Sequence, residues 1–225
     1  FEGDGWSRYS TGRLLLENLV EWSISNGLNE FDFTIGDEEY KRRWCDRTLN
    51  LYTTIQGNSV KGRLYVVVLE FGVWKGKDIT FIANHLPTKT IYGFDSFYGL
   101  PDHWTGWYGY KKHFNLNGVQ PKVPKNVQLI KGDFSNTIKP FLERHNHEIA
   151  FVHIDSNIYE SAKTVLDNIG NRIKKDTIIV FDEYFNYPNW QQHEFKAFQE
   201  FTNKHSVNYD YIGFTPRSEV VIKVL

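Results

Sequence analysis

The chain has 225 residues, 26 basic and 27 acidic, with both signs interspersed, and this composition gives no sign of a nucleic-acid-binding or membrane-surface protein. No apolar stretch approaches the roughly 20 residues that cross a bilayer and no signal-peptide pattern opens the chain, so we expect a cytoplasmic protein with no membrane contact. The single cysteine, Cys45, excludes an internal disulfide and fits a reducing compartment. Because methionine is absent even at position 1, we expect a fragment or a processed chain.

The first part of the chain, residues 1–60, is predicted to form a small α/β appendage. The run Tyr9-Ser-Thr-Gly-Arg-Leu-Leu-Leu-Glu opens an amphipathic helix, and a strand and a turn follow from Phe31. This part resembles the carboxyl-terminal portion of BioF/CelD-like GNAT acetyltransferases, a resemblance that implies backbone N–H groups able to bind a coenzyme A pyrophosphate. The strands that would complete such a domain are missing, so we expect a remnant that packs on the rest of the chain or mediates dimerisation, with acetyl transfer as the alternative.

Strand and helix patterns alternate through the second part of the chain, residues 64–225. Strands are predicted at residues 66–71, 90–95, 127–133, 149–155, 177–182, 209–213 and 219–224, and helices at 78–86, 136–146, 159–173 and 191–205. This order predicts an α/β fold with a Rossmann-like, doubly wound, mostly parallel sheet and an antiparallel edge strand. Ligands bind such sheets at the carboxyl ends of the strands.

A glycine-containing turn follows the first of these strands, in the run Glu70-Phe-Gly-Val-Trp-Lys-Gly76. The next strand ends in Asp95, where a carboxylate can accept the ribose hydroxyls of an adenosine. The glycine spacing differs from the G-x-G-x-x-G of dinucleotide-binding proteins, and an acid beside the loop suits the sulfonium or amino group of S-adenosylmethionine better than a phosphate. The alternative is a glycine turn in some other α/β protein.

Acidic residues gather at the predicted carboxyl ends of the strands. Asp155 and the pair Asp182-Glu183 follow successive strands, and hard oxygen ligands gathered in this way suit magnesium, calcium or manganese. The alternative for these three acids is capping of neighbouring helix N-termini. His153 lies one strand period from Asp155, so it has either a direct catalytic role or the role of a satisfied core histidine.

These motifs resemble the macrocin O-methyltransferase family of class I S-adenosylmethionine-dependent methyltransferases. The resemblance rests on Leu69-Glu-Phe-Gly-Val-Trp-Lys-Gly, Tyr92-Gly-Phe-Asp-Ser-Phe-Tyr-Gly-Leu-Pro, His153-Ile-Asp and Val180-Phe-Asp-Glu-Tyr-Phe-Asn-Tyr-Pro, and it covers residues 64–225. It implies a divalent cation such as Mg²⁺ on Asp155, Asp182 and Glu183, which orients the acceptor hydroxyl. The candidate cofactor-binding residues are Glu70, Phe71, Gly72, Gly76, Asp95, Ser96, Asp133 and Phe134.

The sequence departs from this family at Asn157. Many members carry an aspartate there as a candidate general base, and a neutral amide cannot take up a proton at useful pH. Either the cation alone acidifies the hydroxyl, or His153 or Asp155 is the base, or activity is weakened or lost. The candidate catalytic residues are therefore Asp155, His153 and Asn157.

A long segment rich in aromatic residues and glycine runs from Phe97 to Phe114. Such residues form adaptable walls for a ring-shaped substrate such as a sugar, although they can equally pack into a small core of their own. The segment lacks the basic groove of a nucleic-acid platform. We therefore hypothesise a cation-assisted O-methyltransferase that acts on a small, saccharide-bearing acceptor and is compatible with a homo-oligomer. The alternative is a non-catalytic S-adenosylmethionine-binding or assembly module.

Overall fold

The computed structural model describes residues 67–105 and 111–225, together with Ser25. Apart from Ser25, these residues belong to the second of the two units into which the chain divides, Leu51–Leu225. The helix and strand predicted within residues 1–60, and Cys45, lie outside the described residues.

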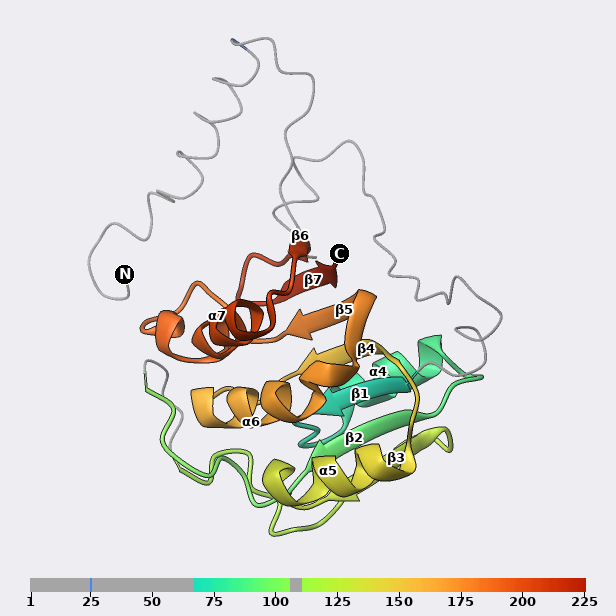
Figure 1. Cartoon of the computed structure of the whole chain (residues 1–225). Helices are drawn as coiled ribbons and strands as arrows, with labels where there is room; N and C mark the ends of the chain where they lie inside the picture. The colour runs from blue at the N-terminus through green and yellow to red at the C-terminus, as the bar shows by residue number, and fades with distance from the viewer. Residues whose placement is uncertain (1–24, 26–66, 106–110) are drawn as a thin grey trace, which may run out of the picture. The chain divides into compact units, whose positions relative to one another are not determined.

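Seven strands form one sheet in the order β3-β2-β1-β4-β5-β7-β6 (Figure 1). They are β1 (Val67–Phe71), β2 (Ile91–Asp95), β3 (Val127–Lys131), β4 (Ile149–Ile154), β5 (Ile173–Phe181), β6 (Tyr209–Phe214) and β7 (Val220–Val224). Strands β1 to β5 pair in parallel, and this confirms the expected mostly parallel α/β sheet.

The two closing strands form the antiparallel edge that the sequence predicts, and their order within it is β7 and then β6. β7 pairs antiparallel with both β5 and β6, and β6 forms the edge. The reason is apolar burial: Val220, Ile222 and Val224 of β7 are buried, whereas β6 presents Tyr211, Ile212 and other exposed side chains. The more apolar strand therefore takes the position that is covered on both sides.

Helices cover both faces of the sheet, which makes it doubly wound. Helices α5 (Phe134–Arg144), α6 (Tyr159–Ile169) and α7 (Glu194–His205) lie side by side over one face, and α4 (Lys77–His85) lies behind the other (Figure 1). The larger core forms between helices α5, α6 and α7 and alternate strand residues such as Leu69, Val152 and Ile179. None of the helices in the described ranges is long and apolar enough to cross a membrane.

Two predicted helices differ from the observed elements. The helix expected at 159–173 ends at Ile169 and continues as the single turn η2 (Gly170–Arg172), and β5 begins at Ile173 rather than at 177. The exposed, charged residues at the start of β5 hide this strand in the sequence, and Asp176 there has a positive φ of 69°. The helix expected at 191–205 is divided at His193 into the turn η3 (Trp190–Gln192) and α7.

The strand order reverses between β1 and β4. From β1 the chain first adds β2 and β3 on one side, and it then adds β4 and β5 on the other side. In open α/β sheets, the crevice at the carboxyl ends of the strands beside such a reversal is where ligands bind. The residues that follow β1, β2, β4 and β5 are therefore the ones placed to bind a ligand.

Candidate active site

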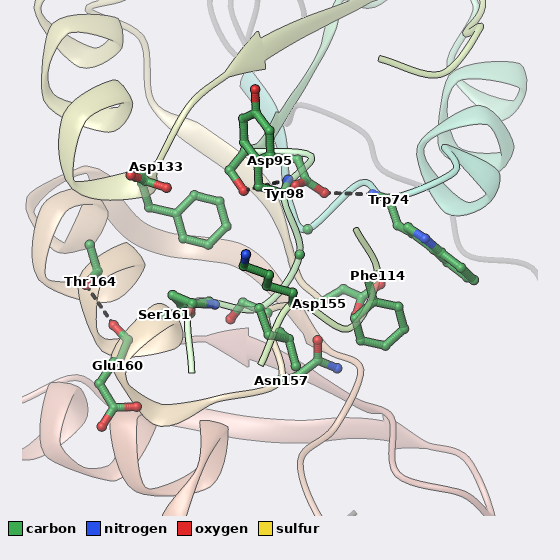
Figure 2. Close-up of a pocket in the computed structure, with 18 of the residues that line it drawn as sticks. Trp74, Asp95, Tyr98, Phe114, Asp133, Asp155, Asn157, Glu160, Ser161 and Thr164 are labelled. Atoms are coloured by element: carbon green, nitrogen blue, oxygen red, sulfur yellow. Dashed lines mark hydrogen bonds between the residues drawn. The ribbon is translucent and has the colours of Figure 1, made fainter. Parts of the chain in front are cut away.

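A cavity of about 510 Å³ opens at this carboxyl edge of the sheet (Figure 2). It is lined by seven of the residues predicted to bind the cofactor or to act in catalysis, namely Gly72, Asp95, Ser96, Asp133, Phe134, Asp155 and Asn157. In Figure 2, Asp133, Ser161 and Thr164 lie on one side of the cavity and Trp74 and Phe114 on the other, with Asp155 between them. The topology thus brings together side chains from five different loops and helices.

Asp95, the last residue of β2, holds the glycine loop in place. Its Oδ2 accepts hydrogen bonds from the backbone N–H groups of Val73, at 2.9 Å, and Trp74, at 2.7 Å. Its Oδ1 accepts another from Phe97 N–H at 2.7 Å. Because an ionised carboxylate offers about four lone-pair sites, these three bonds leave room for about one further donor, which suits one ribose hydroxyl better than two.

The residues at the start of α5 line another part of the cavity. Asp133 is the N-cap residue of α5, and its backbone carbonyl accepts hydrogen bonds from Asn136 and Thr137 N–H. The ring of Phe134 lies edge-on to Phe71, with a centroid distance of 5.5 Å. The strand expected at 127–133 therefore ends at Lys131, and the helix begins at Phe134 rather than at 136.

Three of the predicted cofactor residues do not line the cavity. Phe71 is fully buried and stacks on Phe94 in the core, at a centroid distance of 4.8 Å. Gly76 is the N-cap residue of α4, in the left-handed conformation. Glu70 is buried and contacts His153. The prediction of these three residues as direct cofactor ligands stays a prediction.

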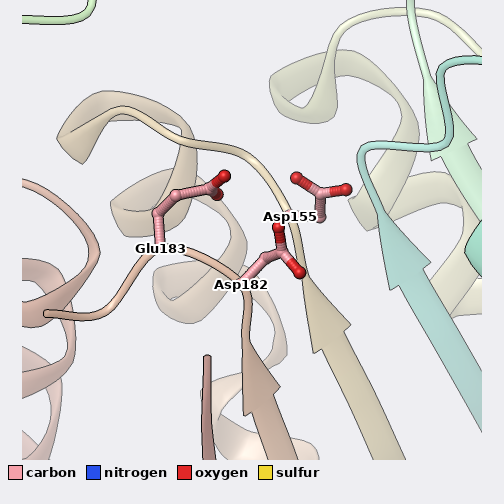
Figure 3. Close-up of side chains that lie close together, drawn as sticks. All are labelled: Asp155, Asp182 and Glu183. Carbon is pink, nitrogen blue, oxygen red and sulfur yellow. The ribbon is translucent and has the colours of Figure 1, made fainter. Parts of the chain in front are cut away.

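Asp155, Asp182 and Glu183 form an acidic cluster beside the cavity. One carboxylate oxygen from each lies within 4.8 Å of the others, and Figure 3 shows the three carboxylates gathered beyond the ends of β4 and β5. None of the three caps a helix, since the N-cap residues of α6 and α7 are Ile158 and His193, so capping does not explain their convergence.

Electrostatics in the acidic cluster reflect this crowding. Burial, reinforced by Asp182, raises the pKa of Asp155 well above its usual value. Burial, reinforced by Asp155, raises the pKa of Glu183 in the same direction. Burial would also raise the pKa of Asp182, but the interaction with the nearby imidazole of His153 outweighs it and lowers the pKa. The cluster therefore tends to hold protons unless another positive charge is present.

His153 lies between two carboxylates. Its Nδ1 is 3.3 Å from Oε2 of Glu70, and its Nε2 is 3.8 Å from Oδ1 of Asp182. Burial lowers the pKa of His153, but the interactions with Asp182 and Glu70 outweigh it and raise the pKa well above the usual value. A raised pKa favours the protonated imidazole, which cannot accept a further proton, so this arrangement favours the core-histidine alternative over a role as general base.

Sequence reasoning missed Glu194, the first residue of α7. Its side chain is fully buried, and its carboxylate accepts hydrogen bonds from the loops that follow β4 and β5. Burial, reinforced by Asp182, raises the pKa of Glu194 to about 8 against the lowering effect of its backbone hydrogen bonds. The only sequence signal was an acidic residue in the first turn of a helix, and such residues usually face solvent.

Aromatic side chains form the wall opposite Asp133. Trp74 has a positive φ of 43°, and its ring lies edge-on to Phe114 at a centroid distance of 5.2 Å. Tyr98 and Leu100 also line the cavity, and Leu100 and Trp104 are buried in a small cluster with Ile158 and Tyr187. The described parts of the segment from Phe97 to Phe114 therefore do both of the things expected of it: some side chains face the cavity and others make a local core.

Comparison with known proteins adds two family matches. The profile of a family described as a methyltransferase domain matches residues 69–184, which is more than half of the chain. The profile of an acetyltransferase (GNAT) domain matches residues 3–42. No curated protein sequence matches the chain.

Solved structures of methyltransferases share the fold. The calicheamicin methyltransferase CalS11 superposes with a TM-score of 0.58 at 23% identity, over 70% of this chain and 72% of that one. A second CalS11 structure, described as a TDP-rhamnose 3'-O-methyltransferase, superposes with a TM-score of 0.50 at 23% identity, over 70% of this chain and 71% of that one. The O-methyltransferase NovP superposes with a TM-score of 0.53 at 18% identity, over 70% of this chain and 71% of that one.

Proposed function

Because the chain belongs to the methyltransferase-domain family and is a class I S-adenosylmethionine-dependent methyltransferase, we propose that it methylates a hydroxyl of a small, saccharide-bearing acceptor with the help of a divalent cation. The observation that carries the proposal is the acidic cluster of Asp155, Asp182 and Glu183 at the edge of the cofactor cavity. Its intact geometry favours an active enzyme over a non-catalytic module that only retains the fold.

The residues of the acidic cluster fit a hard divalent cation. One carboxylate oxygen from each lies within 4.8 Å of the others, a span that one ion can bridge with ligand distances of about 2.0 to 2.6 Å. In the described part of the chain, Oε2 of Glu183 is buried without a hydrogen-bond partner. This state is costly for a carboxylate, and a bound cation would relieve the cost. When bound, such a cation acidifies a hydroxyl and fixes its position.

The cofactor would lie along the cavity with its ribose beside Asp95. The glycine loop is held by Asp95 through Val73 and Trp74, so the same carboxylate shapes the loop and can accept a ribose hydroxyl. The ring of Phe134 offers an apolar face for the adenine, and Asp133 lies beside it. This placement brings the sulfonium toward Asp155 and thus toward the acidic cluster.

In the reaction, the acceptor oxygen forms a bond to the methyl carbon, the carbon–sulfur bond breaks, and its electron pair stays on sulfur. The hydroxyl proton must leave; the amide of Asn157 cannot take it, and the raised pKa of His153 disfavours its imidazole as the acceptor. We assign the proton to Asp155 or to water in the cavity. Positioning of the two reacting groups supplies much of the remaining acceleration.

A saccharide-bearing acceptor is supported by the aromatic wall of the cavity. Trp74, Tyr98 and Phe114 line the cavity, and the C–H faces of a sugar ring can pack against aromatic rings of this kind while its hydroxyls remain free. CalS11 is described as acting on TDP-rhamnose, which is consistent with this class of acceptor.

We retain the proposed division into an acetyltransferase-like appendage, residues 1–60, and a methyltransferase domain, residues 64–225. The two family matches, at residues 3–42 and 69–184, support this division. They give no reason to assign acetyl transfer to the appendage, because a match of this length is too short for a complete domain.

The experiment that tests the proposal uses the variant Asp182→Asn. We expect this variant to bind S-adenosylhomocysteine like the wild type but to lose most methyl transfer, because Asp182 belongs to the acidic cluster and does not line the cofactor cavity. The matched control is Asp176→Asn, which removes an exposed carboxylate near the other end of β5 that pairs with Lys223 at 2.9 Å. Equal activity of Asp182→Asn and the control would contradict the proposal.

A further inference from the structure

Glu194 connects the two loops that carry the acidic cluster. Its Oε1 accepts hydrogen bonds from the backbone N–H groups of Ser156, at 3.1 Å, and Asn157, at 3.0 Å. Its Oε2 accepts one from the backbone N–H of Glu183 at 3.2 Å. A longer contact of 3.4 Å comes from the hydroxyl of Ser156. One buried carboxylate therefore satisfies backbone groups that follow both β4 and β5.

The position of these contacts matters more than their number. Ser156 directly follows Asp155, and Glu183 is itself a member of the cluster, so two of the three anchored N–H groups are at or next to an acidic residue of the cluster. Asn157 has a positive φ of 64°, a conformation that its hydrogen bond to Glu194 helps to hold. The directions in which Asp155 and Glu183 leave the backbone thus depend on Glu194.

Packing of α7 does not require a charge at this position. The helix already buries Ala197, Phe198 and Phe201 in the main core. Burial of a carboxylate beside other acids is unfavourable, and no lysine or arginine in the described ranges forms an ion pair with it. A residue that costs stability and is not needed for docking is best explained by what it holds in place.

We propose that Glu194 is a positioning residue, which sets the spacing of Asp155 and Glu183 by tying together the backbones of their two loops. This inference rests on the proposed function, because it assigns Glu194 to the cation site of that reaction. Residues that orient metal ligands commonly change metal affinity by about 10- to 100-fold when they are replaced. Glu194 would act in this way through backbone groups rather than through the ligand side chains.

The test is the full-length variant Glu194→Gln, with Mn²⁺ as the probe. Glutamine has nearly the same shape, but its NH₂ group cannot accept a hydrogen bond, so one of the two loops is released. We expect calorimetry to show an Mn²⁺ dissociation constant about tenfold or more above that of the wild type. The affinity for S-adenosylhomocysteine should stay within about twofold, because Glu194 does not line the cavity.

The matched control is Glu200→Gln on the same helix. Glu200 accepts a hydrogen bond from the Tyr159 hydroxyl at 2.8 Å and pairs with Lys163 at 3.4 Å, with no link to the acidic cluster. This variant should bind Mn²⁺ like the wild type. A general effect of charge loss on α7 would instead weaken Mn²⁺ binding in both variants, and that result would overturn the inference.

The remaining outcomes are also decisive. Wild-type Mn²⁺ affinity in folded Glu194→Gln would overturn the inference alone, whereas absence of Mn²⁺ binding by the wild type would overturn the cation of the proposed function and the inference with it. If Glu194→Gln does not fold, Glu194→Asp keeps the charge on a shorter side chain and should show the same loss of Mn²⁺ affinity. Full Mn²⁺ affinity in that variant, or failure of both variants to fold, would overturn the positioning role.

Discussion

Gly72 at the end of β1 lies against the backbone of Asp155 at the end of β4, so closely that a Cβ atom at Gly72 would overlap the carbonyl oxygen of Asp155. Gly72 also has a φ of 97°, which L-residues with a side chain rarely adopt. Glycine at this position therefore allows the ends of β1 and β4 to lie close together at the point where the strand order reverses. The cofactor cavity and the acidic cluster both depend on that approach.

Replacement of Gly72 by alanine should destabilise the protein by about 3 kcal/mol or more, because the neighbouring atom is backbone and cannot rotate away. The control is Gly76→Ala, where φ is also positive but the nearest atom is a side-chain methyl of Val123 at 3.2 Å. This change should cost about 1 to 2 kcal/mol. Urea unfolding measures both values, and equal losses would show that the contact with Asp155 is unimportant.

Asp95→Asn should weaken the binding of S-adenosylhomocysteine by about 1.5 to 3 kcal/mol, the value of hydrogen bonds to a charged group. The amide removes the charge and also turns an NH₂ group toward donors such as Trp74 N–H, so the loop loosens as well. Asp102→Asn, a change at an exposed residue of the following segment, is the control. Unchanged affinity of Asp95→Asn by calorimetry would remove Asp95 from the cofactor site.

Asn157→Asp should raise turnover on a true acceptor by roughly 10²-fold, at the lower end of the effect of a general base. Asn157 lines the cavity, so an aspartate there would lie where it could take the hydroxyl proton. It would also add a carboxylate near Asp155 and Glu194, so we expect a lower melting temperature in the absence of a cation. A flat or reduced rate in a folded variant would show that proton removal occurs elsewhere.

The stability of the cation-free protein should decrease as the pH rises from about 5 to 8. Asp155 and Glu183 have raised pKa values, caused first by burial and then by neighbouring acids. A carboxyl group of this kind stabilises the fold fully below its unfolded-state pKa of about 4, and this contribution is lost as the pH passes through the folded-state pKa. His153, whose pKa is also raised, changes stability in the same direction above about pH 6.5.

A bound cation should offset this loss, so the increase in melting temperature caused by Mg²⁺ should be larger at pH 8 than at pH 5.5. Differential scanning fluorimetry in chelator and in Mg²⁺, at both pH values, measures the difference. Asp182→Asn, which lacks one member of the acidic cluster, should abolish most of the Mg²⁺ effect. An Mg²⁺ effect that is independent of pH would contradict the assignment of these carboxylates to a cation site.

Much of the fold could be predicted from the sequence because strand residues such as Val67 to Phe71, all apolar except Glu70, form a run that only a sheet covered on both faces can bury. The convergence of Asp155, Asp182 and Glu183 could be predicted for a related reason: the carboxyl ends of neighbouring parallel strands meet at one edge. The position of β7 could not be predicted, because strand order among β5, β6 and β7 is decided by relative burial and not by local pattern.

Other features of the site depend on contacts between residues far apart in the chain. Glu194 lies 37 residues from Asn157, and nothing in its local sequence indicates that it is buried. His153 could be placed beside Asp155, but its position between Glu70 and Asp182 depends on the register of β1, β4 and β5. Such registers follow from packing of the whole sheet, so the environment of His153 could be read only from the structure.

The most direct test of the proposed reaction is methyl transfer by a metal-free preparation. Labelled S-adenosylmethionine and a panel of saccharide-bearing small molecules would be incubated with the protein in excess chelator and then with added Mg²⁺. We expect transfer to a hydroxyl with Mg²⁺ present and a loss of about 10²-fold or more in chelator, because the cation both acidifies and positions that hydroxyl. Full methyl transfer in excess chelator would contradict the cation-assisted mechanism.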